Sequence, residues 1–311
     1  MLHIRNKMDK DYKQEQPLFL GIDGGGSKCK AILMDQNNTI LGTGISGPGN
    51  PVYGSELAKI SIVESASLAL TEALLNSDIS QELKLNDICA GIGLAGVNLP
   101  HVYDEMIKWQ SPFKSIYLTT DIHIACLGAH EGHDGAVLIS GTGTCGLSNV
   151  KNHSKIIGGH GFPQGDKGSG AWYGLNAVEA VLLALDEMAP PTTISKYMCQ
   201  VLKASTAEEI ISKVAGKPAS FFACLANTVF SALEDKDEVA LAIIDEGASY
   251  ISKMARLLLK TTPPRISFIG GLAEWIIPYL DQDIQKQLSS SLFPPEAGAV
   301  FYARHQTASL K

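Results

Sequence analysis

The sequence predicts an α/β protein with two similar halves, each opening on a β-meander around a turn rich in glycine, serine and threonine. A chain of 311 residues favours two domains, since a domain usually takes about 100–200 residues. The hydrophobic fraction of 45% and the charged fraction of 18% are typical of a globular chain. Thirty glycines exceed the average content of about 7%, so we ask whether they gather in particular loops.

In the first half, short apolar runs are separated by polar turns, which predicts three consecutive antiparallel strands. A longer segment then has helical apolar spacing, and it is followed by strands and helices in alternation. The predicted strands are 18–23, 28–34, 39–45, 87–95 and 115–120, and the predicted helices are 55–76, 99–110 and 121–130.

The second half opens in the same way and then becomes mostly helical. The predicted strands are 135–140, 145–150, 155–159 and 265–269, and the predicted helices are 171–187, 207–214, 221–234, 238–259, a short one from 272, and 296–303. Sequence identity between the halves is slight, so the internal repeat depends on the order of elements alone. We expect a disordered leader over 1–16 and domains over 17–132 and 133–311, with the last helix able to pack back on the first domain.

Charge and composition argue against several classes of partner. The net charge is −7 and no basic stripe is present, which excludes typical nucleic-acid and anionic-membrane binders. No apolar stretch approaches the ~20 residues that span a bilayer. The six cysteines are far apart and form no CxxC pair, so a metal or redox motif is not expected. We therefore expect a reduced, cytoplasmic protein.

The segment Asp23-Gly24-Gly25-Gly26-Ser27-Lys28 joins the first two strands. Three glycines can expose backbone N–H groups to phosphate oxygens, and the Ser27 hydroxyl adds a donor. Asp23 at the strand end can hold Mg²⁺ or a water bound to it, because hard cations prefer oxygen ligands. The segment matches neither a Walker loop nor a dinucleotide fingerprint. A plain glycine hairpin explains it equally well.

The segment Gly141-Thr142-Gly143-Thr144 lies between two strands of the second half. Taken alone it is also a plain hairpin. Two such hairpins, one opening each half, would clamp the two ends of a triphosphate if they faced each other across a cleft.

Three further segments carry candidate polar groups. Asp121 follows a strand at a helix start, where ligands bind in open α/β sheets, although such an acid is also a common N-cap. A carboxylate there could accept a proton from a hydroxyl that attacks phosphorus. Asp166 lies in the glycine-rich loop 158–170 and suits either a cap or hydroxyl recognition. Gly270 and Gly271 form a tight βα turn that lets a flat ring approach the backbone.

These segments (DGGGS, TTD, SGTGT, GDKGSG and IGG) carry a resemblance that runs from about Phe19 to Ala303. The chain resembles the acetate and sugar kinase / Hsp70 / actin superfamily. More narrowly it resembles the BadF/BadG/BcrA/BcrD ATPase family, which includes N-acetylglucosamine kinase and bacterial glucosamine kinase. The resemblance implies two ribonuclease-H-like domains that close on ATP, Mg²⁺ and an amino sugar.

The resemblance also implies roles for individual residues. Asp121 matches the base that activates the sugar 6-hydroxyl, Asp23 would hold Mg²⁺ through water, and Thr142 would lie near the β- and γ-phosphates. The implied ATP-binding residues are Asp23, Gly24, Gly25, Gly26, Ser27, Lys28, Gly141, Thr142, Gly143, Thr144, Gly270 and Gly271. The implied sugar-binding residues are Asn50, Ala95, Gly96, Asp121, Gly159, His160, Gly161 and Asp166.

The expected activity is ATP-dependent phosphorylation of the 6-hydroxyl of glucosamine or N-acetylglucosamine, in a protein that we expect to be a homodimer. Lys167 and His160 depart from the family pattern beside the sugar, which leaves the preferred 2-substituent open. Two alternatives remain at this point: an ATPase activator of a reductase, which would hold an iron–sulfur cluster between subunits, and a non-catalytic sugar sensor. The segment His130-Glu131-Gly132-His133 is not HExxH and does not predict a zinc site.

Overall fold

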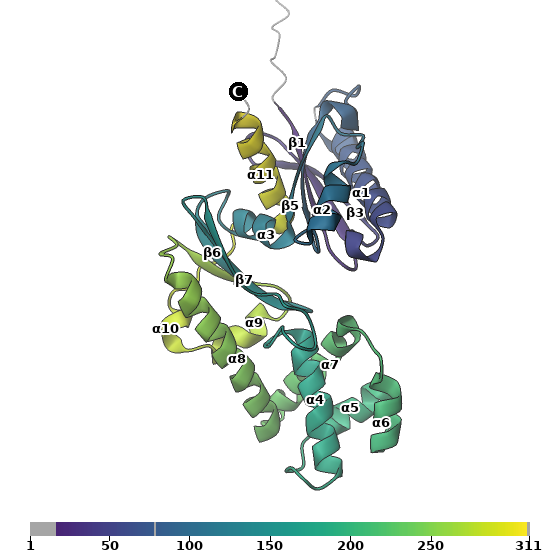
Figure 1. Ribbon diagram of the computed structural model, residues 1–311, viewed down its shortest axis with the longest axis vertical. Coiled ribbons are helices and arrows are strands. Elements are labelled where there is room, and N and C mark those ends of the chain that lie inside the picture. Colours follow the sequence, from purple (N-terminus) through teal and green to yellow (C-terminus); the bar gives the residue numbers. More distant parts are fainter. Residues whose placement is uncertain (1–16, 78, 310–311) are drawn as a thin grey trace, which may run out of the picture.

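The computed structural model describes residues 17–77 and 79–309, which form two lobes with a β-sheet in each (Figure 1). The leader predicted for 1–16 lies outside the described residues. None of the helices in the described ranges is long and apolar enough to cross a membrane.

The first sheet has the strand order β3-β2-β1-β4-β5. Its strands are β1 (Phe19–Gly24), β2 (Cys29–Met34), β3 (Ile40–Ser46), β4 (Cys89–Leu94) and β5 (Ser115–Thr120). The first three pair antiparallel as the predicted meander, while β1, β4 and β5 run parallel. The carboxyl ends of these three parallel strands therefore meet at one edge, which is where an open α/β sheet places its ligand.

Helices cover both faces of this sheet. Helices α1 (Ser55–Asn76) and α2 (Pro100–Ile107) pack on one face, and α11 (Pro295–Ser309) packs on the other. Small residues permit the close approach of α11: a Cβ at Gly21 or Gly91 would lie 1.9 Å from the carbonyl oxygen of Glu296 or Ala299. The last helix of the chain is thus part of the first lobe.

The second sheet repeats the topology with the order β8-β7-β6-β9. Its strands are β6 (Gly135–Ser140), β7 (Thr144–Val150), β8 (His153–Gly158) and β9 (Ile266–Ile269). Again the first three are an antiparallel meander and the fourth is parallel to the first. One face is covered by α4 (Gly170–Leu185), α5 (Ile194–Leu202), α6 (Ala207–Val214), α7 (Ala219–Glu234) and α8 (Glu238–Leu259).

Helix α3 (Asp121–Ala129) contacts both sheets and the last helix. A Cβ at Gly93 of β4 would lie 2.3 Å from the Ile124 side chain, so α3 packs tightly on the first sheet. Ile122 and Cys126 pack with Val137 of β6 in a separate apolar cluster. The α/β fold with two ribonuclease-H-like domains predicted from sequence is confirmed, and α3 is the joint between them.

Several elements differ from the sequence prediction. Helix α5 was not predicted, because it has nine residues and follows shortly after Pro190 and Pro191. The last helix extends to Ser309. The prediction ended it at 303 because its final turns are polar and have no apolar periodicity. The short helices α9 (Ala273–Ile276), η3 (Ile277–Tyr279) and α10 (Gln282–Gln285) follow β9 closely.

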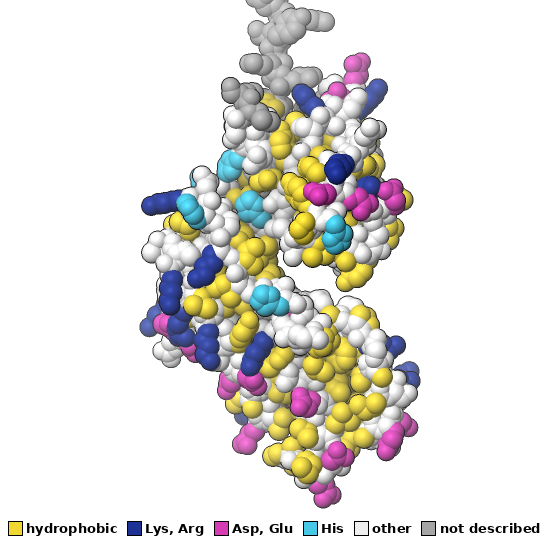
Figure 2. All heavy atoms as spheres, viewed as in Figure 1, with side chains coloured by type: hydrophobic (Ala, Val, Ile, Leu, Met, Phe, Trp, Pro, Cys, Tyr) yellow, Lys and Arg dark blue, Asp and Glu magenta, His cyan; other side chains and the backbone are white. Residues whose placement is uncertain are grey.

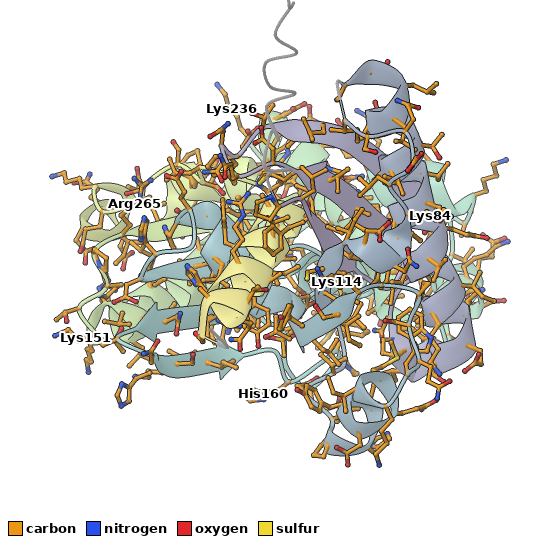
Figure 3. The ribbon with its side chains drawn as sticks, turned by 90° about the horizontal axis from the view of Figure 1, so that it is seen from above. Lys84, Lys114, Lys151, His160, Lys236 and Arg265 are labelled. Atoms are coloured by element: carbon orange, nitrogen blue, oxygen red, sulfur yellow. The ribbon has the colours of Figure 1, made fainter. Side chains whose placement is uncertain are left out.

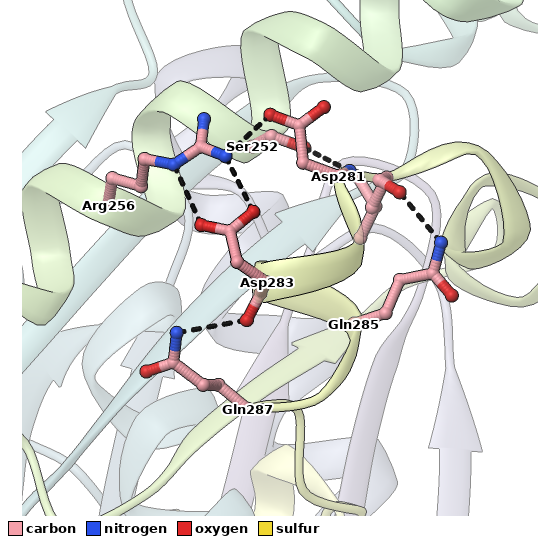
Figure 4. A network of polar contacts seen from close by, with 7 residues as sticks. Ser252, Arg256, Asp281, Asp283, Gln285 and Gln287 are labelled. Atoms are coloured by element: carbon pink, nitrogen blue, oxygen red, sulfur yellow. Dashed lines mark hydrogen bonds and ion pairs between the residues drawn. The ribbon is translucent and has the colours of Figure 1, made fainter.

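A polar network fastens this last group of short helices to α8 (Figure 4). Arg256 donates to Asp283 through two nitrogens, at 3.0 and 2.6 Å, and lies 2.6 Å from an Asp281 oxygen. Ser252 accepts a hydrogen bond from the Asp281 N–H at 3.0 Å. The charged side chains of Arg256, Asp281 and Asp283 are exposed, so each ion pair contributes little alone. The shared guanidinium nevertheless orders the chain that follows the Gly270-Gly271 turn.

Candidate active site

The first glycine hairpin lies at the carboxyl edge of the first sheet. The N–H of Gly25 donates to the Lys28 carbonyl at 2.9 Å, which closes the turn. Gly26, Ser27 and Lys28 are exposed at its tip. Gly24 is enclosed, because a Cβ there would lie 2.4 Å from the Leu94 side chain. The hairpin is therefore anchored at its base and open to a ligand at its tip.

Asp23 lies at the base of this hairpin with two other carboxylates near it. Burial, followed by the charges of Asp121 and Glu296, raises the pKa of Asp23 to about 7, while Lys28 and Lys30 oppose the shift. A bound cation would favour the ionised form of Asp23 and so lower this pKa.

The residues of the expected sugar-binding group from the first half lie against the same hairpin. Gly49 donates to the Gly25 carbonyl at 2.9 Å, and Ala95 donates to the Gly24 carbonyl at 3.0 Å. Asn50 accepts a hydrogen bond from the Val52 N–H at 2.9 Å and caps a short 3-10 helix, η1 (Pro51–Tyr53). A Cβ at Gly96 would lie 2.9 Å from Asn50 Oδ1. The structure thus brings together three segments that are far apart in sequence.

Asp121 is the first residue of α3, but it is not the N-cap. The cap is Thr120, whose hydroxyl accepts from the His123 N–H at 3.3 Å. Asp121 accepts from the Ile122 N–H at 2.8 Å. Burial raises the pKa of Asp121, and its backbone hydrogen bonds oppose the shift. The capping explanation for Asp121 does not hold, so its position at the sheet edge needs another reason.

The second hairpin lies at the equivalent edge of the second sheet. Ser140 is buried and donates to the Gly168 carbonyl at 2.8 Å, while Gly170 donates to the Gly141 carbonyl at 2.8 Å. No described residue comes within 4 Å of where a Cβ at Gly141 would be. The hydroxyl of Thr144 is buried without a hydrogen-bond partner in the described part of the chain. An open backbone and an unpartnered hydroxyl both suit an oxygen-rich ligand.

Asp166 lies against the second hairpin. A Cβ at Gly143 would lie 2.9 Å from Asp166 Oδ2. Asp166 adopts a left-handed backbone with φ of 61°, and the cap of α4 is Ser169, which accepts from the Trp172 N–H at 3.1 Å. Burial raises the pKa of Asp166, while nearby backbone N–H groups and His160 lower it. The capping explanation therefore fails for Asp166 also.

The Cys145 thiol of β7 is influenced by one carboxylate from each lobe. Burial raises the pKa of the Cys145 thiol to about 12, with further contributions from the charges of Asp121 and Asp166. The Asp121 charge also raises the pKa of Asp23, so Asp121 influences groups at both hairpins. Figure 2 shows the space-filling surface hollowed between the two lobes.

The start of the glycine-rich loop is open to solvent. Gly159, His160 and Gly161 are exposed, and Gly159 donates to the Thr144 carbonyl at 2.9 Å. Figure 3 shows His160 at the rim of the molecule. Lys167 instead lies 2.6 Å from Glu246 of α8, with its ammonium 5.6 Å from the centre of the Trp172 ring. The Lys167 charge is thus already paired within the second lobe.

The Gly270-Gly271 turn lies beside the second hairpin. Leu272 donates to the Ser140 carbonyl at 3.2 Å. Gly270 has φ of 103°, and a Cβ there would lie 2.3 Å from the same carbonyl oxygen, so glycine is required. In the part of the chain that the structure describes, no atom lies within 4 Å of where a Cβ at Gly271 would be, so this turn has one packed and one open glycine.

The carboxylates fit a magnesium ion held mainly by a nucleotide. Among the described residues, no group of three or more His, Cys, Asp and Glu side chains is placed to hold a metal by itself. Mg²⁺ in nucleotide sites usually takes one or two carboxylates together with phosphate oxygens and water. Asp23, with its raised pKa and half-buried position, meets that requirement.

Sequence reasoning missed two charged residues of this site, Lys30 and Glu296. The Lys30 ammonium pairs with Oε1 of Glu296, and the Glu296 side chain is only 3% exposed. Lys30 is one strand away from Asp23, so its place opposite the hairpin could have been found from the meander. Nothing in the sequence links it to a glutamate 266 positions later.

Three relatives support one family. The chain is 32% identical to the glucosamine kinase of Vibrio cholerae over 292 residues, covering 92% of this chain and 95% of the relative. It is 28% identical to the N-acetyl-D-glucosamine kinase of Dictyostelium discoideum over 255 residues, covering 78% and 79%. A Chromobacterium violaceum structure, provisionally assigned as an N-acetylglucosamine kinase, matches with a TM-score of 0.84 at 23% identity, covering 93% and 99%.

The two curated relatives match over most of their own length, so the likeness extends to both lobes and the site between them. The solved structure is too distant in sequence to add more than the fold. The model of the BadF/BadG/BcrA/BcrD ATPase family matches residues 20–303, which span both glycine hairpins and all the carboxylates described above. The chain belongs to the BadF/BadG/BcrA/BcrD ATPase family.

Proposed function

We propose that this protein transfers the γ-phosphoryl group of ATP to the 6-hydroxyl of an amino sugar, glucosamine or N-acetylglucosamine. The observation that carries the proposal is the pair of glycine hairpins at equivalent edges of the two sheets, with Asp23 and Asp121 at that edge of the first sheet. The relatives named as glucosamine and N-acetylglucosamine kinases support the amino-sugar class.

In this proposal the hairpins bind the nucleotide. Residues 24–28 and 141–144 offer backbone N–H groups and hydroxyls to the phosphates, and Thr142 and the unpartnered Thr144 hydroxyl face the same ligand. Asp23 would hold Mg²⁺ through water, and the ion would neutralise phosphate charge. Gly271 leaves open backbone for the adenosine, while the Gly270 turn packs on Ser140.

Asp121 acts as the general base. It accepts the proton of the sugar 6-hydroxyl while that oxygen bonds to the γ-phosphorus; the bond from phosphorus to the β–γ bridging oxygen breaks, and ADP leaves with its electron pair. Burial raises the Asp121 pKa, which makes the carboxylate a better proton acceptor than an exposed aspartate. The hydroxyl and the phosphate are held in line by opposite lobes, so most of the catalysis is positioning.

The sugar would lie between Asn50, Ala95 and Gly96 on one lobe and the loop residues Gly159, His160, Gly161 and Asp166 on the other. Support comes from the contacts of the first group with the Asp23 hairpin and of Asp166 with the Gly143 hairpin. Because Lys167 pairs with Glu246, it need not repel the cationic amine of free glucosamine. Both amino sugars therefore remain substrates in this proposal.

No specific observation favours the two alternative functions. Cys29 and Cys126 are buried, and of the six cysteines only Cys224 is exposed, which does not suit a cluster shared between subunits. The homodimer and the cytoplasmic location remain predictions from sequence.

A direct test measures ADP formation by the purified protein with glucosamine, N-acetylglucosamine, glucose and N-acetylmuramic acid. We expect the highest kcat/KM with one of the first two. Asp121→Asn should lower kcat by about 10²–10⁴-fold, the usual contribution of a general base, with ATP binding retained. Asp104→Asn, at an exposed position on α2, is the matched control and should be silent. Retained turnover in Asp121→Asn would remove the base assignment, and failure of every sugar would remove the kinase function.

A further inference from the structure

The ion pair between the half-buried Lys30 and the buried Glu296 lies beside Asp23. Lys30 and Asp23 are paired across the antiparallel strands β2 and β1, so their side chains leave the same face of the sheet. Directly opposite residues have Cβ atoms about 4.5–5.5 Å apart, within easy reach of a lysine. That face is the one covered by α11, whose first turn carries Glu296.

Lys30 can therefore reach the carboxylates of Asp23 and Glu296, and in the structure it forms its ion pair with Glu296. Its ammonium contacts Oε1 of Glu296, and the two side chains are 34% and 3% exposed. Glu296 can come this close because Gly21 has no side chain: the Glu296 carbonyl lies over the position of the missing Cβ. A buried carboxylate is costly without a partner, so Glu296 keeps a strong hold on the lysine.

The pairing of Lys30 with Glu296 determines whether the negative charge of Asp23 at the first hairpin is neutralised by a lysine. With Lys30 bound to Glu296, no lysine in the described ranges forms an ion pair with Asp23. The other nearby cation, Lys28, is exposed at the tip of the turn. If the Glu296 charge were absent, Lys30 would turn to Asp23 and form the cross-strand pair. Asp23 would then be neutralised from within the protein, and a metal ion would have to compete with an ammonium for it.

We propose that Glu296 is a positioning residue that withdraws Lys30 from Asp23 and so keeps that carboxylate free for magnesium-bound nucleotide. The inference rests on the proposed role of Asp23 and adds the last helix to the site. In this proposal, the packing of α11 on the first lobe has a functional role, because the helix supplies the negative charge of Glu296 that pairs with Lys30.

The test is a set of variants: Glu296→Gln, Lys30→Met and the double variant Glu296→Gln/Lys30→Met. Calorimetry measures ADP binding at increasing Mg²⁺ and in EDTA, without sugar. Glu296→Gln should raise the Mg²⁺ concentration needed for half-maximal binding by about tenfold, the effect of one opposite charge on a neighbouring carboxylate. The double variant has no lysine to misplace, so it should return to within about threefold of wild type. Binding in EDTA should change little throughout.

The matched control is Glu56→Gln, which breaks an exposed ion pair with Lys59, 2.7 Å, on helix α1 and should leave the Mg²⁺ dependence unchanged. Denaturant unfolding of each variant detects misfolding, which would affect Glu296→Gln and the double variant alike. An unchanged Mg²⁺ dependence in Glu296→Gln, or a double variant as impaired as the single one, would overturn the proposal. Asp23→Asn tests the premise separately: if it leaves the Mg²⁺ dependence intact, the metal assignment is wrong whatever the Glu296 variants do.

Discussion

The two glycine hairpins occupy equivalent places in two sheets of the same topology, yet they differ in where their charge comes from. The first follows Asp23 and is surrounded by Lys28, Lys30 and the distant Glu296. In the second the residue before the first glycine is Ser140, which is buried and bonded to the Gly168 carbonyl. Its carboxylate, Asp166, comes from a separate loop and lies against Gly143.

This difference shows that two copies of one fold can present different binding groups at the same place. The first hairpin supplies fixed charge at its base and is suited to a metal-bound phosphate. The second supplies open backbone, a buried hydroxyl and a carboxylate on a left-handed loop position, and is suited to hydrogen bonding. The same strand topology thus supports two kinds of recognition, because the residue before the first glycine differs and the second hairpin takes its carboxylate from a separate loop.

The largest expected effect comes from Asp23→Asn in the first hairpin. It should lower kcat/KM by about a hundredfold or more, since a preorganised charge at the phosphates is lost. It should also stabilise the ligand-free protein. The Asp23 pKa is raised from 3.8 to about 7, so the folded state binds more protons than the unfolded state within that window. Stability then falls as pH rises through the window, and the full cost is present above about pH 7.

Urea unfolding of wild type and Asp23→Asn at pH 5 and pH 8 checks this expectation. The variant should gain more free energy of unfolding at pH 8 than at pH 5. Ser140→Asn, at the equivalent place in the second hairpin, should give no such gain and should only destabilise. A loss of stability at pH 8 in Asp23→Asn would mean that the first hairpin does not store an unfavourable charge.

The next prediction compares alanine substitutions at Gly24, which is packed in the first hairpin, and at Gly141, which is open in the second. Gly24→Ala forces a Cβ against Leu94 and the Gly49 carbonyl, so it should cost about 1–3 kcal/mol in the free energy of unfolding. Gly141→Ala meets nothing within 4 Å and should leave unfolding unchanged. If phosphate approaches Gly141, that variant should still raise the KM for ATP by about tenfold. Unfolding curves and ATP kinetics together check both; a Gly141→Ala enzyme with wild-type KM argues against phosphate contact there.

A smaller effect is expected at Ser140, the counterpart of Asp23. Ser140→Ala removes the hydrogen bond to Gly168 and should cost about 1 kcal/mol of stability. Since this hydroxyl does not face the ligand, kcat should fall much less than in Asp23→Asn. Steady-state kinetics and urea unfolding check the two statements, and a kcat loss as large as that of Asp23→Asn would give Ser140 a chemical role instead.

The smallest effect is expected at Lys167 beside the second hairpin. Because its ammonium pairs with Glu246 and covers Trp172, Lys167→Met should leave the ratio of kcat/KM values for glucosamine and N-acetylglucosamine within about twofold. Glu246→Gln, which frees the lysine, is the informative partner and should lower kcat/KM for the cationic sugar selectively. A marked rise in glucosamine preference in Lys167→Met would show that the lysine faces the sugar after all.

Much of the molecule could be predicted from local patterns. Helix α1 was predicted at its observed bounds, and both meanders followed from apolar runs separated by short turns. The short α5 was not predicted because it has only nine residues and follows shortly after Pro190 and Pro191, although its buried residues Ile194, Met198 and Leu202 have helical spacing. The end of α11 was not predicted because its last turns are polar. Asp121 and Asp166 were identified as candidates, but only the contacts of Thr120 and Ser169 removed the capping explanation for each.

The sequence by itself determined the α/β class, the two meanders and the family, because these follow from short-range periodicity and contiguous motifs. The assembly of the site required the tertiary structure, since its parts are separated along the chain. Glu296 reaches Lys30 only because α11 returns across Gly21 and Gly91 to the first sheet. Asp166 reaches the second hairpin only through a left-handed turn in its loop. Long-range packing of backbone against glycine brings these charges together, and no local pattern encodes such contacts.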